Sequence, residues 1–444
     1  MRILRTAAAS IALATAAIAS PALANLEEIG AAVDADYDSY LEPLFVHFHK
    51  NPELSFLENK TAARMAQELR AAGLEVTENV GGTGVVGMVK NGEGPLILLR
   101  ADMDGLPVQE KSGLDYASVA TQVGQDGKEY PVMHACGHDV HITSMVGTAR
   151  QLMSMKDKWS GTLMFIVQPA EERVGGAKAM LADGLYDRFG KPDYALAFHV
   201  SSVLQTGLVS AAEGIQYSSS DSVDITVPGI GAHGASPHMG RDPVYIASQI
   251  VTALQSIVSR EIMPLSPAVI TVGSFQAGSK HNIISDEAKL QLTVRSNDEA
   301  VRAQLLAAIQ RVAVNVGKAH GLPEDLPVKV EVVEGTPVTY NDPALARRLN
   351  GVMKRDLGES AFKEFQQLGM GAEDFAYFVA DELGVPGYYF AVGGTPKSAF
   401  DAQEAGGPRV PSHHSPLFKI APRESVTLGT RAMIAAVLDL APAN

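Results

Sequence analysis

The sequence contains a single cysteine, Cys136, among 444 residues, so a disulfide within the chain is excluded. It also lacks a basic tract, since 36 Lys and Arg stand against 50 Asp and Glu and give a formal net charge of −14. A nucleic-acid partner is therefore not expected. Charged residues make up only 19% and hydrophobic residues 46%, which is too apolar for a disordered chain. The length allows two or three domains with sizeable cores.

Long apolar runs are absent except near the N-terminus. Residues 6–20 form an Ala-rich run that follows Arg2 and Arg5 and precedes Ala22-Leu23-Ala24. This pattern is typical of a secretory signal peptide, and the run is shorter than the roughly 20 apolar residues of a membrane span. We therefore predict a signal peptide over residues 1–24, a periplasmic or secreted protein, and no membrane association after signal cleavage.

Short apolar segments alternate with helical segments in the next part of the chain. Strands are expected over residues 84–89, 95–100, 161–167 and 194–198, and helices over 37–49, 58–72 and 140–155. Strands that are apolar on both faces and separated by helices favour a buried, mainly parallel sheet covered on both sides. This part of the chain is therefore expected to have an α/β fold.

A different order of elements begins near residue 220. It reads strand, helix, strand, strand, helix, strand, over residues 221–227, 243–262, 269–275, 289–295, 299–320 and 328–333. This is the order of a ferredoxin-like α+β unit. Afterwards helices over 343–356 and 425–438 flank a strand over 387–392. We therefore predict a catalytic metal-binding domain over 25–215 and 336–444, with an inserted lid or dimerisation domain over 216–335.

Side chains that bind metals gather where predicted strands end. The groups are Asp102 with Asp104, Cys136 with His138, Glu171 with Glu172, and His199. Taken alone, the pair Cys136 and His138 favours an inert buried cysteine, and the pair Glu171 and Glu172 favours a solvated acidic loop. Because the carboxyl ends of parallel strands meet at one edge of a sheet, the groups together predict a metal site there.

The chemistry of these donors narrows the metal and suggests a reaction. Nitrogen, oxygen and sulfur ligands together suit Zn, Mn, Co or Ni rather than Mg or Ca. Of two adjacent glutamates, one is expected to bind the metal and the other to move a proton. The helix that follows Cys136 is expected to lower the pKa of its thiol through the positive end of the helix dipole.

The motifs resemble the hippurate hydrolase and N-acyl-amino-acid amidohydrolase branch of the aminoacylase–carboxypeptidase metallopeptidase family. The matching positions run in family order over nearly all of the chain after residue 24. They are 49–54 with Glu58, 100–107, 133–141, 168–172, His199, 231–238, Asn282, Arg295, 371–375 and 414–416.

The resemblance implies two divalent metal ions per subunit, drawn from Zn, Mn, Co or Ni. The metal ligands that it implies are Cys136, His138, Glu172, His199 and His414. It makes Glu171 the general base and gives Asp104 the task of orienting a ligand. His413 is a rival for His414, and the spacing to Ser-Pro favours His414.

The resemblance also implies roles for three residues of the inserted domain. His233 is expected to polarise the substrate carbonyl, in its own chain or across a homodimer or higher homo-oligomer. Asn282 and Arg295 are expected to bind the carboxylate and amide of the substrate. For Arg295 an interstrand salt bridge remains the alternative.

The function that follows is an exported metal-dependent amidohydrolase acting on N-acyl amino acids or related small conjugates. One alternative is a periplasmic carboxypeptidase or dipeptidase that acts on short peptides. A second alternative, of another class, is a noncatalytic solute-binding protein on the same scaffold. Two polar, Gly-containing stretches, 121–130 and 397–409, are candidates for the rims of the cleft.

Overall fold

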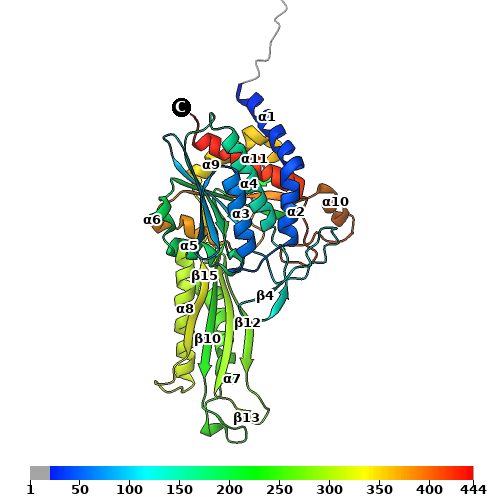
Figure 1. The fold of residues 1–444 in the computed structure, drawn as a ribbon. Helices are drawn as coiled ribbons and strands as arrows, with labels where there is room; N and C mark the ends of the chain where they lie inside the picture. The colour runs from blue at the N-terminus through cyan, green and yellow to red at the C-terminus, as the bar shows by residue number, and fades with distance from the viewer. Residues whose placement is uncertain (1–20, 444) are drawn as a thin grey trace, which may run out of the picture.

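The structure is a computed structural model that describes residues 21–443, with side chains from residue 27 onward. Its upper part in Figure 1 is a sheet with helices on both faces, and its lower part is a long sheet backed by two helices. None of the helices in residues 21–443 is long and apolar enough to cross a membrane.

The larger sheet has seven strands in the order β1-β2-β6-β3-β7-β17-β8. Its central strands β6, β3, β7 and β17 are parallel, as predicted, and both edges pair antiparallel. Residues 92–95 join β2 to β3 and are too few for the crossover between parallel strands, so β2 runs antiparallel to β3. Because β3 and β6 are parallel, β2 also pairs antiparallel with β6. The strands are β1 (Glu75–Val80), β2 (Gly84–Asn91), β3 (Leu96–Asp102), β6 (Gly161–Gln168), β7 (Tyr194–Gln205), β8 (Val209–Ser210) and β17 (Gly387–Thr395).

Helices cover both faces of this sheet, as the apolar strands predict. One face carries α1 (Pro21–Asp36), α2 (Glu42–Lys50), α3 (Asn59–Ala71), α4 (His138–Ser154), α9 (Pro343–Leu357) and α11 (Pro422–Leu440). The other carries the shorter α5 (Gly176–Ala182) and α6 (Leu185–Phe189). Helix α4 is buried along most of its length, where it packs against α11. The first residue of α4, His138, is therefore held rigidly at the sheet edge.

The smaller sheet has the antiparallel order β12-β14-β10-β15 of a ferredoxin-like unit. Its strands are β10 (Ser219–Pro228), β12 (Ala268–Ala277), β14 (Glu287–Ser296) and β15 (Lys329–Thr336). Helices α7 (Pro243–Ser256) and α8 (Glu299–Ala319) pack on one face around a core of its own, which includes Ile225, Ile250 and Leu290. The division of the chain at residues 216 and 335 remains a prediction.

Several short elements were not predicted because their sequences are polar or brief. The stretch 121–130 forms most of a hairpin of β4 (Thr121–Val123) and β5 (Glu129–Pro131), and 397–409 begins with α10 (Lys397–Glu404). Two further antiparallel pairs lie elsewhere, β9 (Gly214–Tyr217) with β16 (Thr339–Asn341), and β11 (Ala232–His233) with β13 (Ile283–Ile284).

The N-terminal segment corrects the prediction of export. Residues 1–20, which hold most of the predicted signal peptide, lie outside the described residues. The predicted cleavage motif Ala22-Leu23-Ala24 lies within α1, whose backbone stays helical to Asp36 and which packs on α11 through residues such as Val33. The prediction of a periplasmic or secreted protein is therefore wrong.

Candidate metal centre

The predicted metal ligands converge at the carboxyl edge of the central parallel strands. β3 ends at Asp102, β6 ends at Gln168 just before the two glutamates, and β7 carries His199. Five donor groups among the described residues each have ligand atoms within 4.8 Å of one another, and three of these groups contain two or more of the predicted ligands. They are Cys136–His138–His199, Cys136–Glu172–His414 and His138–Glu171–Glu172. Because Cys136 belongs to two of these sets, the geometry suits two neighbouring cations.

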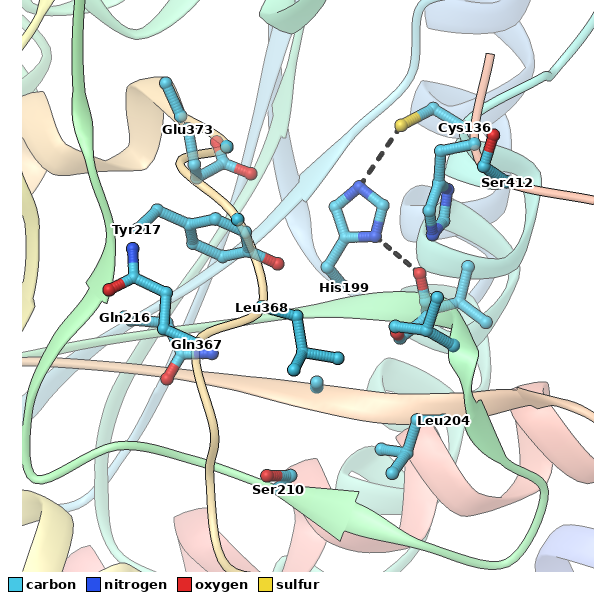
Figure 2. A pocket seen from close by; sticks show the side chains of 18 of the residues that line it. Cys136, His199, Leu204, Ser210, Gln216, Tyr217, Gln367, Leu368, Glu373 and Ser412 are labelled. Carbon is cyan, nitrogen blue, oxygen red and sulfur yellow. Dashed lines mark hydrogen bonds between the residues drawn. The ribbon is translucent and has the colours of Figure 1, made fainter. Parts of the chain in front are cut away.

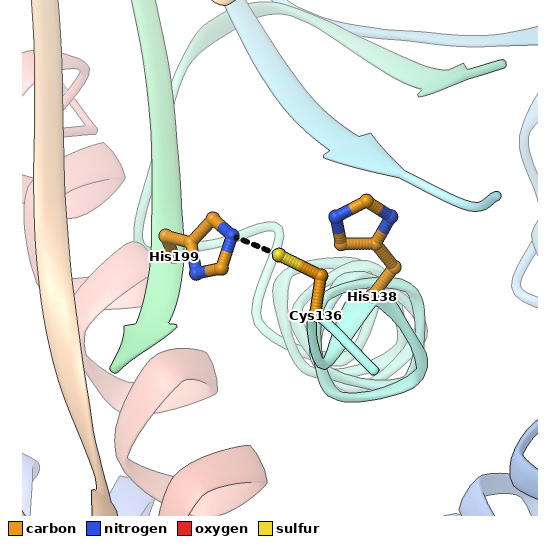
Figure 3. Close-up of side chains that lie close together, drawn as sticks. All are labelled: Cys136, His138 and His199. Carbon is orange, nitrogen blue, oxygen red and sulfur yellow. Dashed lines mark hydrogen bonds between the residues drawn. The ribbon is translucent and has the colours of Figure 1, made fainter. Parts of the chain in front are cut away.

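The hydrogen bonds of two histidines fix which ring nitrogen faces this centre. His138 Nδ1 lies 2.8 Å from the carbonyl oxygen of Asp104, and His199 Nδ1 lies 2.6 Å from that of Val200. A carbonyl only accepts, so both Nδ1 atoms carry a proton, and in the neutral ring, which a bound cation would favour, both Nε2 atoms present a lone pair. His199 Nε2 lies 3.4 Å from Cys136 Sγ, and His138 stands on the other side of that sulfur (Figure 3). Both imidazoles are thus oriented to bind a cation.

Buried atoms without a partner show that the donor set fits a metal. Among the described residues, His138 Nε2 and Glu172 Oε1 are buried and have no hydrogen-bond partner. The other oxygen of Glu172, Oε2, lies 3.4 Å from His414 Nε2. Buried polar atoms are rarely left unpaired, and thiolate, imidazole and carboxylate are the usual ligands of zinc. A divalent cation would satisfy the unpartnered atoms together.

Asp104 shapes the turn that carries both glutamates. Its carboxylate accepts the backbone N–H groups of Glu171 and Glu172, each at 3.1 Å, and the hydroxyl of Ser55 at 2.6 Å. The turn is strained, because Ala170 (φ 49°) and Val174 (φ 51°) have left-handed conformations. The contacts of Asp104 therefore support the prediction that it orients ligands.

Two other histidines lie beside the centre. His141 Nδ1 lies 2.5 Å from Asp102, and its Nε2 accepts the N–H of Val200 at 2.9 Å. His413 Nε2 accepts the N–H of Ser202 at 3.1 Å. His413 Nδ1 is buried and has no hydrogen-bond partner among the described residues, but His414, and not His413, forms a donor group with Cys136 and Glu172. This grouping favours His414 as the ligand from the C-terminal segment.

Sequence reasoning missed the charged network behind the ligands. The guanidinium of Arg100 is fully buried and contacts Asp102 at 2.6 Å, Glu373 at 2.6 Å and Asp374 at 3.1 Å. Tyr389 adds a hydroxyl that donates to Glu373. Arg100 and the segment 371–375 are both part of the family pattern, but their spacing of more than 270 residues gave no sign that they meet.

The expected effect of α4 on the Cys136 thiol is wrong in direction. Burial, and after it the neighbouring Glu172 and Glu171, raise the pKa of the thiol well above its usual range. The helix N-terminus is too weak to offset desolvation beside two carboxylates. A bound cation is the group that would favour the thiolate here.

A cavity of about 770 Å³ opens onto this centre. Cys136, Glu171, Glu172, His199 and His414 line it, and Arg295 from β14 also lines it. In Figure 2 Cys136 and His199 lie in one part of the cavity, and Tyr217, Gln367 and Leu368 lie in another. Of the predicted substrate-binding residues, the structure therefore brings Arg295 to the centre.

His233 and Asn282 lie elsewhere in the chain. His233 belongs to β11, which pairs with β13, and the carbonyl of Asn282 accepts the N–H of Gly234 at 2.9 Å. Both residues are exposed, and neither lines the cavity. Figure 1 shows β13 at the end of the small sheet opposite the helices α4 and α11. The structure places His233 and Asn282 together, away from the metal ligands of their own chain.

The chain is similar in sequence to known peptidases and hydrolases. The family model for peptidase family M20/M25/M40 matches residues 98–405. The hippurate hydrolase of Campylobacter jejuni subsp. jejuni is 39% identical over 344 residues, which cover 77% of this chain and 86% of that protein. Thermostable carboxypeptidase 2 of Saccharolobus solfataricus is 38% identical over 349 residues, covering 78% and 83%.

A solved structure also resembles this one. The Bacillus subtilis YXEP protein, described as a dinuclear metal-binding peptidase of the M20 family, superposes with a TM-score of 0.72 at 27% identity. The match covers 92% of this chain and 98% of that one.

Proposed function

We propose that this chain, which belongs to peptidase family M20/M25/M40 and is a metal-dependent amidohydrolase, hydrolyses the amide bond of N-acyl amino acids. The observation that carries this proposal is a guanidinium in the cavity of the metal centre that has no carboxylate partner among the described residues. Arg295 Nη1 donates to the carbonyl of Met370 at 2.8 Å, and no carboxylate among the described residues pairs with it. Arginine binds carboxylates through two parallel hydrogen bonds, so Arg295 suits the carboxylate of an amino acid.

The acidic groups of the cavity indicate whether the substrate nitrogen is a free α-amine or is acylated. A peptide with a free α-amine needs a carboxylate partner there. Apart from the two glutamates of the centre, the acidic lining residues are Glu364, which is exposed, and Glu373, which Arg100 binds. An acylated nitrogen needs no such partner, and this favours N-acyl amino acids over dipeptides.

The residues proposed to hold two divalent metals are Cys136, His138, Glu172, His199 and His414. A bound metal supplies Lewis-acid polarisation of the scissile carbonyl. Glu171 is the proposed general base, with Oε2 at 3.8 Å from His138 Nε2. Burial, and then Glu373 and Glu172, raise the pKa of Glu171 well above its usual range, so its carboxylate is a strong base once ionised, and a bound cation would favour the ionised form. Glu171 thus accepts a proton from the attacking water and returns it to the leaving amine.

The proposed active unit is a homodimer in which His233 serves the centre of the partner subunit. His233 Nδ1 accepts the N–H of Ala235 at 3.0 Å, so Nε2 carries the proton of the neutral ring and is exposed. That N–H suits the oxygen of a carbonyl or of a tetrahedral intermediate. Its position beside β13, outside the cavity of its own chain, supports a contribution across the dimer.

An assay of amine release tests the proposal. The protein is loaded in turn with Zn, Mn, Co or Ni and offered hippurate, N-acetyl amino acids and dipeptides. We expect turnover of the acylated amino acids, lowered by about 10²–10⁴-fold in Glu171→Gln with metal content retained. Glu324→Gln, an exposed glutamate of the inserted domain, serves as the control. Turnover of dipeptides alone would favour the peptidase alternative.

A further inference from the structure

We infer that Glu58 is a positioning residue of the metal centre, and that its buried carboxylate holds the turn that carries Glu171 and Glu172. This inference rests on the proposed function, because it gives Glu58 a task in the reaction of the same centre. Glu58 belongs to the family pattern but does not line the cavity. It acts on the centre through the backbone of a neighbouring segment.

Glu58 stands at the N-terminus of α3, but its side chain does not cap that helix. The N–H groups of Lys60 and Thr61 and the hydroxyl of Thr61 all bond to Glu53 instead, at 2.9, 2.7 and 2.9 Å. The side chain of Glu58 is completely buried. A buried carboxylate needs hydrogen-bond donors, so the partners of Glu58 indicate what it does.

One carboxylate oxygen of Glu58 binds two residues that have a left-handed backbone. Oε1 accepts the N–H of Phe56 and the N–H of Ala170, each at 2.9 Å. The φ angle is 61° at Phe56 and 49° at Ala170. A residue other than glycine keeps this conformation only where its surroundings hold it there. Ala170 directly precedes Glu171, so its bond to Glu58 fixes the direction in which the chain enters the turn.

Glu58 and Asp104 together bind three consecutive N–H groups of the turn. The N–H groups of Glu171 and Glu172 bond to Asp104, and that of Ala170 bonds to Glu58. Hydrogen bonds to an ionised acceptor are stronger than those between neutral groups. Without Glu58, Ala170 is free to leave the left-handed region, and this would redirect the side chains of both glutamates.

Phe56 and Thr83 give Glu58 a fixed place beside the turn. Thr83 Oγ1 donates to Glu58 Oε2 at 2.5 Å. A Cβ atom on Gly175 would lie 3.4 Å from the ring of Phe56, so this ring lies against the far end of the turn. Glu58 thus secures the start of the turn directly, through Ala170, and its end through Phe56.

The surroundings of Glu58 indicate that glutamine can replace it. Burial, and after it the charge of Asp104, raise the pKa of Glu58 to about 7. The neutral form is therefore accessible near neutral pH, and a glutamine amide has the same shape. Its oxygen accepts from Phe56 and Ala170, and its nitrogen donates to the hydroxyl of Thr83. An aspartate keeps the charge, but its side chain is one methylene too short to reach Ala170.

Four variants test this task, namely Glu58→Ala, Glu58→Asp, Glu58→Gln and the matched control Glu53→Ala. The control is matched because each carboxylate accepts three hydrogen bonds, and those of Glu53 come only from Lys60 and Thr61 in α3. Two quantities are measured. They are the affinity for Co²⁺, from an absorption titration, and kcat and KM for hippurate at saturating Co²⁺.

We expect Glu58→Ala and Glu58→Asp to lose about 10–100-fold in both Co²⁺ affinity and kcat, the range for residues that orient metal ligands. KM should change little, because Arg295 is not altered. Glu58→Gln should restore most of both quantities, and Glu53→Ala should keep the values of the wild type. Urea unfolding checks that each variant is folded; if Glu58→Ala does not fold, Glu58→Asp takes its place.

The outcomes separate the positioning role from the proposed function. Wild-type Co²⁺ affinity or wild-type kcat in folded Glu58→Asp would overturn the role of Glu58. Equal losses in Glu53→Ala would also overturn it, because they would reflect general destabilisation, and so would losses in Glu58→Gln as large as those in Glu58→Asp. If the wild type binds Co²⁺ but hydrolyses no N-acyl amino acid, the proposed function is wrong. The Co²⁺ titration then still decides whether Glu58 positions Glu172.

Discussion

At the residue scale, the partners of each histidine nitrogen decide which histidines can bind a metal. His138 and His199 each give Nδ1–H to a backbone carbonyl, which leaves Nε2 free. His141 has partners at both nitrogens, whereas His413 accepts a backbone N–H at Nε2 and keeps a buried Nδ1 without a partner among the described residues. The sequence shows where these residues stand relative to strands, but a tautomer depends on a partner that only the folded chain supplies.

The single thiol allows a direct test of the metal site. If Cys136 binds the metal as a thiolate, bound metal should protect it from a thiol reagent, and chelation should make it react at least about tenfold faster. The titration belongs at alkaline pH, because burial and the neighbouring glutamates raise the pKa of the thiol. Cys136 is the only cysteine, so the signal has one source. Equal rates with and without chelator, in protein that remains folded, would contradict metal ligation by Cys136.

At the element scale, the turn between β6 and α5 positions both glutamates. The N–H groups of Gly175 and Gly176 both bond to the carbonyl of Ala170, which closes the turn tightly. A Cβ atom on Gly176 would lie 1.5 Å from the carbonyl oxygen of Pro169. No side chain fits at that position without moving the turn, so the glycine is required by close approach of the backbone.

Gly176→Ala should therefore disturb the centre as well as the fold. We expect a loss of about 1–3 kcal/mol in the free energy of unfolding, as for other overpacked sites, together with weaker metal binding. Gly351→Ala is the matched control, because Gly351 lies in α9 and has no neighbour within 4 Å of an added Cβ. That change should be neutral or stabilising by up to about 1 kcal/mol. Urea unfolding and metal analysis of both variants measure the effects; unchanged metal affinity in Gly176→Ala would refute the coupling.

The elements also show which parts of the fold a periodic sequence pattern can predict. Long apolar segments such as 161–167 and 243–262 predicted strands and helices correctly, because burial imposes a period on the sequence. The β4–β5 hairpin and α10 were missed, because their polar residues pack little and carry no such period. The ion pairs of Arg100 were also missed, since they join segments that are distant in the chain.

On the scale of the whole molecule, the predicted site residues fall into two groups. The ligands, Glu171, Asp104 and Arg295 surround one cavity or its edge, whereas His233 and Asn282 lie together at the far end of the small sheet (Figure 1). The family pattern predicted both groups, and the structure brings the first group to one edge of the sheet, where the strands end. A sequence states which residues are present, but it does not show whether a residue acts in its own subunit or in a partner subunit.

Mixing two inactive variants tests whether His233 serves a partner subunit. Glu171→Gln removes the proposed base from one copy, and His233→Ala removes the proposed carbonyl donor from the other. In a heterodimer with shared sites, one of the two centres combines an intact Glu171 with an intact His233. Random exchange of subunits makes half of the dimers mixed, so the mixture should recover about a quarter of wild-type activity if each centre works independently. Mass measurement under native conditions checks that subunits have exchanged. Exchanged dimers that stay inactive would show that His233 does not act across the interface, and a protein that remains monomeric while active would exclude the dimer altogether.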